Sequence, residues 1–383
     1  MKSESWKIPL YKIYTDDEDV NLITKIVKRG NNWAIGPEIE EFENKIKEHL
    51  GAKYCLALNS GTSALHAIYL AHNILPNQEI IVPSFTFIST VNSTLFINAI
   101  PKFADIEEDT FGIDPEKIEN VITSETKAII PVHIGGNPCK ILELKEIAEK
   151  NNLLLIEDAA ESLGASINDK KIGTIGDSSI FSFCGNKVLT TGEGGAIVTD
   201  SKEIYEKVKL IRSHGRIDKI NYFNNPEKSE YVDIGYNWRM SSITASLGIS
   251  QMNKLEKIIK KRQDNAKYIS DSLEKIKEIQ VPRQKEGNKH IFQMYTIRLE
   301  DKKSRNDLHA YLTEKRIFSK VYFEPVHLAD FYKKKFGTSL GMLPITEKIA
   351  EQVLTLPLYP NMTNEEKDYL ISTIREFFET YSK

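Results

Sequence analysis

The sequence contains few cysteines, and their spacing excludes the sites that cysteine pairs usually form. The 383-residue chain has three of them, Cys55, Cys139 and Cys184, and no two stand in a C-x-x-C pair. We therefore expect neither a disulfide framework nor a cysteine-rich zinc site, and we predict that no metal is bound. Such cysteine usage suits a reducing compartment, so we predict a cytoplasmic location.

Long apolar runs and a large excess of one charge are also missing. No run of 18 apolar residues occurs, and the first residues, MKSESWKIPLYKIYTDDED, lack the apolar core of a signal peptide. We therefore expect no membrane span and no secretion signal. Lysine and arginine number 51 and aspartate and glutamate 54, a net charge of −3. A general attraction to nucleic acid or to an anionic membrane is therefore not expected.

Short apolar runs alternate with helical patterns over the first two thirds of the chain. Strands are expected at 53–58, 79–83, 102–106, 128–132, 153–157, 179–183 and 195–199, and helices at about 63–72, 89–98, 114–121 and 142–150. Continuous apolar runs are typical of strands that are covered on both faces of a parallel sheet. The pattern predicts an α/β fold whose ligands bind outside the carboxyl ends of the strands.

The last third of the chain has a different pattern. Apolar residues over 240–261 recur at mostly three- and four-residue steps, which predicts one long helix. Beyond it, helices mix with short strands such as 293–298, and a turn is expected at 285–289. We predict a large domain over residues 1–261, which includes an N-terminal arm and the long helix, and a smaller α/β domain over residues 262–383.

A first candidate site follows the strand at 53–58. Ser60, Gly61, Thr62 and Ser63 open a helix there. Backbone N–H groups at a helix N-terminus, together with hydroxyl groups, suit a phosphate. An ordinary N-cap explains the same residues, and for this segment alone it is the more common explanation.

A second candidate site lies at the end of the apolar strand 153–157. Glu157 and Asp158 follow one another there, and an acid at the carboxyl end of a central strand faces the ligand crevice. The alternative is a solvated acid or a helix cap. That alternative suits Glu157 better than Asp158, because the small residues Ala159 and Ala160 permit close approach to Asp158.

A third candidate site is the segment FSFCGNKVLTTGEGG, in which Lys187 stands between a buried-type strand and a glycine-rich turn. A lysine held among apolar residues can form a Schiff base with a carbonyl compound. The alternative is a surface lysine in a hairpin, as most lysines are exposed. The glycines do not match a dinucleotide-binding fingerprint, because they precede a strand and not a helix.

The three sites gain weight when they are taken together and in order. Pyridoxal 5′-phosphate (PLP) needs hydroxyl and N–H groups for its phosphate, a carboxylate for its pyridinium nitrogen and a lysine for its aldehyde. The segments around Ser60, Asp158 and Lys187 supply these three requirements.

The sequence resembles the DegT/DnrJ/EryC1 family of PLP-dependent sugar aminotransferases. The resemblance covers nearly the whole chain through NSGTSALH, VPSFTF, PVHIGG, IEDAAES, GTIGDSSIFSFCGNKVLTTGEGG, RSHGR, GYNWRMS and LPLYPNMT. It implies the PLP-dependent transferase fold type I, similar to aspartate aminotransferase. This fold has a large domain with a mostly parallel, seven-stranded mixed sheet and a smaller C-terminal α/β domain.

The resemblance also implies roles for individual residues. Lys187 would form the Schiff base, Asp158 would pair with the pyridinium nitrogen, and Glu161 would lie near the ring hydroxyl. The phosphate ligands would be Ser60, Gly61, Thr62 and Ser182, and Phe87 would stack on the ring, with Phe85 as the alternative. Asn237, towards the phosphate, and Arg239 would reach the neighbouring subunit's site, which implies a homodimer with shared sites. Arg239, His327 and Phe85 are candidate substrate contacts.

The implied reaction moves the amino group of L-glutamate to a nucleotide-linked ketosugar, through the pyridoxamine 5′-phosphate form of the cofactor. The motif around Lys187 is similar to that of enzymes acting on C4 of nucleotide-linked 4-keto-6-deoxy sugars. Among these enzymes the GDP-perosamine synthases are the most similar group, so we favour GDP-4-keto-6-deoxymannose as the acceptor. The product would serve O-antigen or other surface-glycan synthesis. The segments 133–137 and 325–332 depart from the family pattern, so UDP- or dTDP-linked ketosugars aminated at C4 or C3 remain alternatives. A non-catalytic PLP-binding regulatory protein is another.

Overall fold

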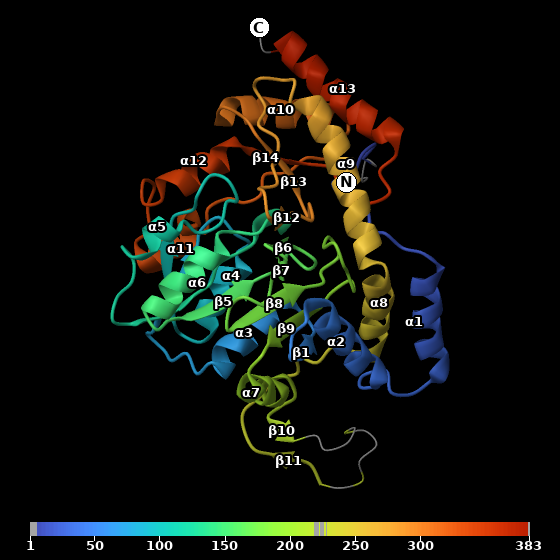
Figure 1. Ribbon diagram of the computed structural model, residues 1–383, viewed down its shortest axis with the longest axis vertical. Coiled ribbons are helices and arrows are strands. Elements are labelled where there is room, and N and C mark those ends of the chain that lie inside the picture. Colours follow the sequence, from blue (N-terminus) through green and yellow to red (C-terminus); the bar gives the residue numbers. More distant parts are fainter. Residues whose placement is uncertain (1–5, 218–221, 223–225, 227, 382–383) are drawn as a thin grey trace.

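The computed structural model describes residues 6–217, 222, 226 and 228–381 (Figure 1). Residues 1–5, which belong to the segment searched for a signal, and residues 382–383 at the end of the expected small domain lie outside the described residues. A sheet with helices on both faces occupies the lower half of the view in Figure 1, and the C-terminal elements lie above it. Within the described part of the chain, no helix is long and apolar enough to cross a membrane.

The central sheet has seven strands in the order β1-β9-β8-β5-β4-β2-β3. Their bounds are β1 (Tyr54–Leu58), β2 (Glu79–Pro83), β3 (Ile100–Ala104), β4 (Thr126–Ile129), β5 (Leu154–Asp158), β8 (Ser178–Ser182) and β9 (Gly195–Thr199). Strand β9 runs antiparallel to both of its neighbours, and the other pairs are parallel. The mostly parallel, seven-stranded mixed sheet of the α/β prediction is thereby confirmed.

Each of the seven apolar runs forms one strand of this sheet, although two strands begin two residues earlier than predicted. Strand β3 begins at Ile100 and not at residue 102, and β4 begins at Thr126 and not at residue 128. Both strands pair with β2, where Glu79 lies opposite Ile100 on one side and Thr126 on the other. Pairing with β2 therefore determines where β3 and β4 begin, and the apolar runs alone do not predict these first residues.

Successive residues of the central strands face two separate cores. Ala57, Ile81 and Leu155 belong to the core on one face of the sheet. Ile80 and Ile156, their neighbours in sequence, belong to the core on the other face. Both faces are covered, which is why these strands are apolar throughout.

Helices cover the two faces in two groups. The first core receives residues of α2 (Pro37–Leu50), α5 (Pro115–Ile118), α6 (Ile141–Lys150) and α8 (Ser242–Asn253). The second core receives residues of α3 (Gly61–Ala71), α4 (Ser89–Phe96), α7 (Lys202–Arg212) and α11 (Asp330–Phe336). This two-sided covering leaves the carboxyl ends of β1, β5 and β8 as the place where polar side chains can gather.

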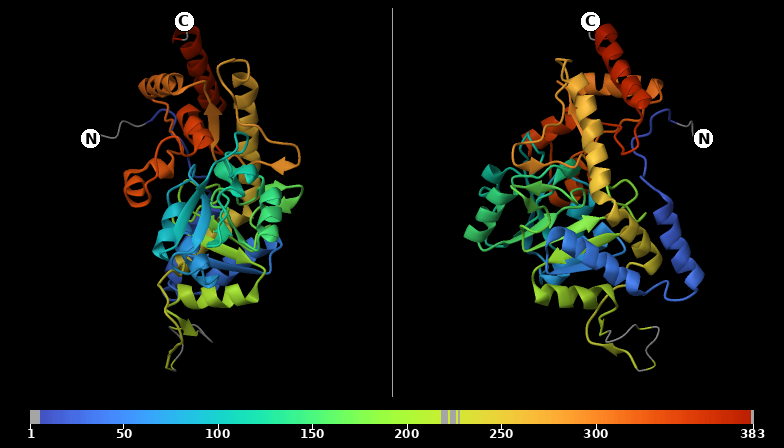
Figure 2. Two further views of the ribbon diagram at one scale, coloured as in Figure 1. Left: turned by 90° about the vertical axis from the view of Figure 1, so that its left-hand side faces the viewer. Right: turned by 45° about the vertical axis from the view of Figure 1, so that its right-hand side comes forward.

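A third core lies in the C-terminal part of the chain. It joins α9 (Leu255–Leu273), β13 (Tyr295–Arg298), α10 (Lys302–Glu314), β14 (Val353–Leu356) and α13 (Asn364–Tyr381), and it also includes Ile8. Both views of Figure 2 place these elements at the end of the molecule opposite β10 and β11. The remaining elements are α1 (Asp17–Arg29), η1 (Ile134–Gly136), β6 (Ser166–Ile167), β7 (Lys170–Lys171), β10 (Arg216–Ile217), β11 (Glu230–Tyr231), β12 (Asn288–Lys289), η3 (Val326–Leu328) and α12 (Pro344–Gln352).

The single long helix that we expected over residues 240–261 is two helices. Helix α8 ends at Asn253 and α9 begins at Leu255, and Lys254 between them has φ −117° and ψ 8°. The Lys254 ammonium lies 2.6 Å from carboxylates of Asp16 and Asp19, which bind it to α1. Helix α9 then continues from the first core into the third core, through residue 261. The domain boundary at that residue stays a prediction.

Candidate active site

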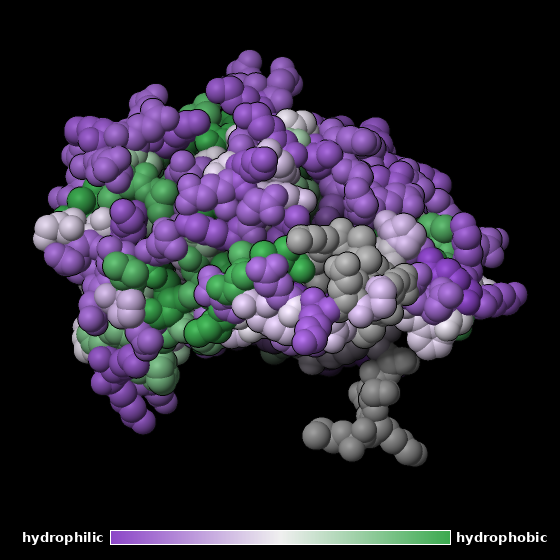
Figure 3. Space-filling view, turned by 90° about the horizontal axis from the view of Figure 1, so that it is seen from below, coloured by the Kyte–Doolittle hydropathy of each residue, from purple (hydrophilic) through white to green (hydrophobic). Residues whose placement is uncertain are grey.

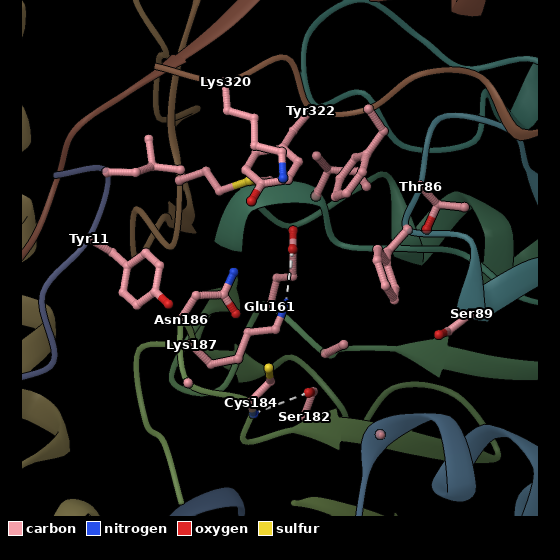
Figure 4. Close-up of a pocket in the computed structure, with 18 of the residues that line it drawn as sticks. Tyr11, Thr86, Ser89, Glu161, Ser182, Cys184, Asn186, Lys187, Lys320 and Tyr322 are labelled. Carbon is pink, nitrogen blue, oxygen red and sulfur yellow. Dashed lines mark hydrogen bonds and ion pairs between the residues drawn. The ribbon is translucent and has the colours of Figure 1, made fainter. Parts of the chain in front are cut away.

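A cavity of about 1060 Å³ opens at the carboxyl ends of β1, β5 and β8. Figure 4 shows polar side chains from several elements converging on it. Its lining includes the predicted residues Ser60, Gly61, Thr62, Phe87, Asp158, Glu161, Ser182 and Lys187. Residues that are up to 127 positions apart in sequence, from Ser60 to Lys187, thus share one space.

The expected phosphate end of the cavity is formed where α3 begins beside the ends of β8 and β9. The Ser60 hydroxyl accepts a hydrogen bond of 3.0 Å from the Ser63 N–H, so Ser60 is the N-cap of α3. The first backbone N–H groups of a helix have no carbonyl partner within the helix. A Cβ atom on Gly61 would lie 3.0 Å from the Ser182 Cβ, and one on Gly195 would lie 2.4 Å from the Ser60 carbonyl oxygen. The two glycines therefore permit this close approach.

Asp158 ends β5 and faces the cavity. Its Oδ2 accepts a hydrogen bond of 2.8 Å from the Thr90 hydroxyl, and its Oδ1 accepts one of 3.1 Å from the Ala160 N–H. Burial raises the pKa of the Asp158 carboxyl above its ordinary value, and these two hydrogen bonds offset only part of that effect. A buried carboxylate in this state favours a cationic partner.

Lys187 lines the same cavity as Asp158, and the Lys187 side chain is 13% exposed. Its Nζ lies 3.1 Å from Glu161 Oε1, and Glu161 Oε2 accepts a hydrogen bond of 2.8 Å from the Gly135 N–H. The alternative of a surface lysine in a hairpin is therefore wrong. The turn that follows Lys187 is held by the Thr191 N–H, which donates to the Phe183 carbonyl at 2.9 Å.

Glu157 differs from what its position suggested. We expected a solvated acid or a helix cap, but its side chain is fully buried. It accepts hydrogen bonds from the N–H groups of Gly173, Ile175 and Gly176 at 2.7–2.8 Å, and its Oε2 lies 3.2 Å from the His133 ring. Burial alone would raise the pKa of Glu157, but His133 and these N–H groups hold it below its ordinary value.

The two candidate stacking residues have opposite positions. Phe87 is 59% exposed and lines the cavity, whereas Phe85 is fully buried outside it. The Phe85 ring packs against Phe111 and Phe323, with ring centroids 5.6 and 6.0 Å away. Of these two candidates, therefore, Phe87 can contact a ring in the cavity, and Phe85 belongs to a core.

Three other predicted residues do not line the cavity of their own chain. Arg239 pairs with Leu58 in an isolated antiparallel bridge, and Asn237 pairs with Ser213 in another. His327 is fully buried, with its Nδ1 2.7 Å from the Ser84 hydroxyl and its Nε2 3.1 Å from Glu347. Because both ring nitrogens of His327 have protein partners, the structure does not bring this residue to a substrate.

Sequence reasoning missed several residues that the fold brings to the cavity. Thr90, on α4, bonds to Asp158, and Lys320 and Tyr322 line the side opposite Lys187 (Figure 4). Thr90 lies three residues after the motif VPSFTF, so its hydroxyl was a signal that could have been used. The segment around Lys320 contains no motif, and only its contacts show that it belongs to the site. Among the described residues, no group of three or more His, Cys, Asp or Glu side chains is placed to hold a metal ion.

Comparison with known proteins identifies the class of this chain. The model of the DegT/DnrJ/EryC1/StrS aminotransferase family matches residues 14–375, and the chain belongs to this family. It is therefore a PLP-dependent aminotransferase.

Individual relatives are similar over nearly their whole lengths. The uncharacterized protein MJ1066 of Methanocaldococcus jannaschii is 37% identical, over 96% of this chain and 97% of its own. GDP-perosamine synthase of Escherichia coli O157:H7 is 34% identical, over 97% of this chain and 98% of its own. The solved structure of Helicobacter pylori PseC, an aminotransferase involved in the biosynthesis of pseudoaminic acid, matches with a TM-score of 0.92 at 28% identity, covering 97% of this chain and 99% of that chain.

The residues of the cavity fit PLP. The cradle formed by the start of α3 and by Ser182 suits the phosphate, because adding a Cβ at Gly61 or Gly195 would obstruct it. The buried Asp158 carboxyl, whose hydrogen bonds come from the Thr90 hydroxyl and the Ala160 N–H, suits the ring nitrogen. Lys187 provides an amine in the same cavity.

Proposed function

We propose that this aminotransferase moves the amino group of L-glutamate to C4 of a nucleotide-linked 4-keto-6-deoxy sugar, with GDP-4-keto-6-deoxymannose as the favoured acceptor. The product would enter the synthesis of a surface glycan. The proposal is supported by the E. coli, Caulobacter vibrioides and Vibrio cholerae relatives named GDP-perosamine synthase, which are 34%, 34% and 30% identical to this chain.

The observation that carries the catalytic part of the proposal is the presence of Lys187, Glu161 and Asp158 in one cavity. PLP, when bound, supplies an aldehyde that combines with amines and a ring that withdraws electrons. In the proposed site the Lys187 Nζ would hold the cofactor, and its free amine would accept and return a proton. Asp158 would keep the ring nitrogen protonated, and the positive charge there would offset the cost of burying the Asp158 carboxylate.

Glu161 fixes the position of the Lys187 amine in the described geometry. Its two oxygens are bound differently, one by the Lys187 Nζ at 3.1 Å and the other by the Gly135 N–H at 2.8 Å. The second contact ties the carboxylate to the backbone, so that the first holds the lysine at a defined place. With PLP bound, Glu161 would also lie near the ring hydroxyl, as the family resemblance implies.

A second acceptor class has specific support. PseC, which shares the fold at a TM-score of 0.92, works in the biosynthesis of a different sugar, pseudoaminic acid. A different ketosugar is therefore the alternative acceptor, and we keep UDP- and dTDP-linked ketosugars, aminated at C4 or C3, as its candidates. A regulatory protein that binds PLP without turnover is less well supported, because both Lys187 and Asp158 are present and face the same cavity.

We also propose that the enzyme works as a homodimer in the cytoplasm, where its unpaired cysteines would remain reduced. Seen from below, hydrophobic residues gather beside the part of the surface that β10 and β11 form (Figure 3). Phe96 on α4 is 50% exposed, and both it and Tyr236 contact the His66 ring, with centroids 5.3 and 5.4 Å away. A second copy is the occupant that would bring Asn237 and Arg239 to a cavity, since they do not reach their own.

The dimer is tested by introducing a charge into this surface. Phe96→Asp should give a monomer in light scattering after size-exclusion chromatography, with loss of turnover, while a charge at the exposed Leu340 should leave a dimer. A dimer that persists in Phe96→Asp would place the interface elsewhere.

Absorbance tests the reaction. The purified protein with PLP should be yellow, should bleach with L-glutamate and should recover its colour with the correct nucleotide ketosugar. A panel of GDP-, UDP- and dTDP-linked ketosugars, read by product mass, then identifies the acceptor. A protein that stays yellow with glutamate would contradict the proposal.

A further inference from the structure

The cavity has an outer end that the cofactor residues do not occupy. There, residues 317–322 form an extended segment whose side chains alternate. Ile317 and Ser319 are buried in the C-terminal part, and Ser319 lies 2.7 Å from the His309 ring. Phe318, Lys320 and Tyr322, at every second position, line the cavity. The alternation of an extended chain therefore presents one set of three side chains to the cavity.

The backbone of this segment is fixed, so that the direction of Lys320 is fixed too. The Lys320 N–H donates to the Thr355 carbonyl at 3.0 Å, and the Thr355 N–H donates to the Lys320 carbonyl at 2.8 Å. These hydrogen bonds attach the segment to β14, which belongs to the third core. Figure 4 shows the Lys320 side chain extending into the cavity, across from Lys187 and Ser182.

An N-terminal arm, residues 6–13, forms the wall beside this segment. The Phe318 N–H donates to the Ile8 carbonyl at 2.9 Å, and the Lys7 N–H donates to the Arg316 carbonyl at 2.9 Å. The Trp6 and Phe318 rings meet edge to face with their centroids 4.9 Å apart, and both line the cavity. Further along the arm, Lys12 is held by Glu366 at 2.7 Å.

The charges of the cavity distinguish Lys320 from its other two lysines. Lys187 pairs with Glu161, and Lys12 pairs with Glu366. Among the described residues, no carboxylate lies within ion-pair distance of the Lys320 Nζ. This atom lies 4.7 Å from the centroid of the Tyr322 ring. An exposed cation with three donors, beside a pair of rings and at the end of a cavity, matches an anion attached to a flat heterocycle.

We propose that Lys320 binds the diphosphate of the nucleotide sugar and that the Trp6–Phe318 pair contacts the nucleotide base. This assignment rests on the proposed function, which provides a substrate with these two groups. The sugar would then extend inward from the diphosphate to Lys187, and the nucleotide would remain at the outer end. The arm and the 317–322 segment together thus form a nucleotide subsite, distinct from the cofactor residues at the sheet.

Binding of nucleoside diphosphates without a sugar tests the charge. GDP, UDP and dTDP are titrated into the PLP-loaded protein by calorimetry, at low and at high salt. Lys320→Met should weaken the best of them about ten- to hundredfold and reduce the salt dependence, because one charged hydrogen-bond donor is lost. Lys320→Arg should retain most of the affinity. Lys303→Met, at an exposed lysine on α10 that pairs with Asp307, is the control that should bind like the unchanged protein.

Tryptophan fluorescence tests the base contact. Trp6, Trp33 and Trp238 are the tryptophans of the chain, and Trp33 does not line the cavity. A nucleoside diphosphate should quench the emission of the unchanged protein and of Trp33→Phe, whereas Trp6→Phe should lose most of this change. Quenching that persists in Trp6→Phe would contradict the proposed contact between the nucleotide base and Trp6.

The rate of bleaching by glutamate separates the failure of this inference from the failure of the proposed function. In Lys320→Met this rate should fall far less than the affinity for the diphosphate, because glutamate carries no diphosphate. If bleaching falls as much as diphosphate binding, Lys320 serves the amino donor and the inference is overturned. Unchanged diphosphate binding in Lys320→Met overturns it as well. If the unchanged protein does not bleach with glutamate, the proposed function itself fails.

Discussion

The two faces of β5 carry one acid each, and the two acids have opposite surroundings. Behind the sheet, Glu157 is surrounded by three backbone N–H groups and the His133 ring. On the cavity face, Asp158 has one hydroxyl and one N–H as partners. The pKa of Glu157 is lowered by its partners, whereas burial leaves the pKa of Asp158 raised.

Two adjacent residues in one strand thus have different roles, one structural and one catalytic. A buried carboxylate whose hydrogen-bonding capacity is filled stabilises the loop that fills it. A buried carboxylate with remaining capacity is prepared for a cation that is not part of the protein. We therefore interpret the Glu157 side as structural and the Asp158 side, with Lys187, as the catalytic one.

The largest effect is expected on the cavity face at Lys187. Lys187→Ala should abolish turnover, because no other amine of the described site has the Glu161 contact at 3.1 Å. Borohydride treatment of the PLP-loaded protein, followed by peptide mapping, should label Lys187 in the unchanged protein. Near-normal turnover in Lys187→Ala, or a label on another lysine, would contradict the assignment.

Asp158→Asn should be the next largest change. Loss of the charge that holds the ring proton should cost several kcal/mol of barrier, on the order of 10³-fold in kcat. Single-turnover absorbance with glutamate measures this directly. Full activity in the variant would show that another group serves the ring nitrogen.

Although Asp158→Asn should lower kcat, it should raise the stability of the PLP-free protein. The raised pKa of Asp158 means that the folded protein binds more protons than the unfolded chain as the pH rises above about 4, the carboxyl's ordinary range. The free energy of unfolding therefore falls with increasing pH in this window, and the loss persists at neutral pH. Urea unfolding at pH 7 should find Asp158→Asn more stable than the unchanged PLP-free protein. A less stable variant would mean that burial of the Asp158 carboxylate does not destabilise the PLP-free folded protein.

On the other face, Glu157→Gln should mainly reduce stability. Breaking a buried ion pair leaves an uncompensated charge, so we expect a loss of about 3–5 kcal/mol in the free energy of unfolding. The kcat of the folded fraction should fall much less than in Asp158→Asn. Glu149→Gln, at an exposed acid on α6, is the matched control, with an expected change below about 1 kcal/mol. A variant that is stable but inactive would reverse our interpretation of the two faces.

The smallest effect is expected at Thr90, which supplies one of the two hydrogen bonds to Asp158. Thr90→Val removes the 2.8 Å bond while it keeps the shape of the side chain, and kcat/KM should fall roughly tenfold. Thr90→Ser should recover most of the loss. An unchanged kcat/KM in Thr90→Val would show that Asp158 is held well enough without this hydroxyl.

Sequence patterns predicted the sheet better than the helix that follows it. The strands are short apolar runs, and each run became a strand because both faces of the sheet are covered. The apolar repeat over residues 240–261 gave no sign of the break at Lys254. At that break, Lys254 pairs with Asp16 and Asp19, more than 230 residues earlier in the sequence, which no local pattern could indicate.

The candidate site divides in the same way. Ser60, Asp158 and Lys187 could be found from the sequence because each lies at the carboxyl end of a strand or in the segment that follows it, and the carboxyl ends of parallel strands meet at one edge of the sheet. Glu157 was misjudged, because its partners come from the loop at residues 173–176 and from His133, and no local pattern announces them.

The amino-acid sequence by itself determined the α/β class, the seven strands and the three segments that suit a cofactor. These follow from periodicity and from residue types within short stretches of chain. Only the tertiary structure decided that Glu157 is buried against the loop at residues 173–176 and His133, and which lysine at the outer end of the cavity has no carboxylate partner among the described residues. Those outcomes depend on pairings such as Ile8 with Ile317 and Lys320 with Thr355, which connect segments far apart in sequence.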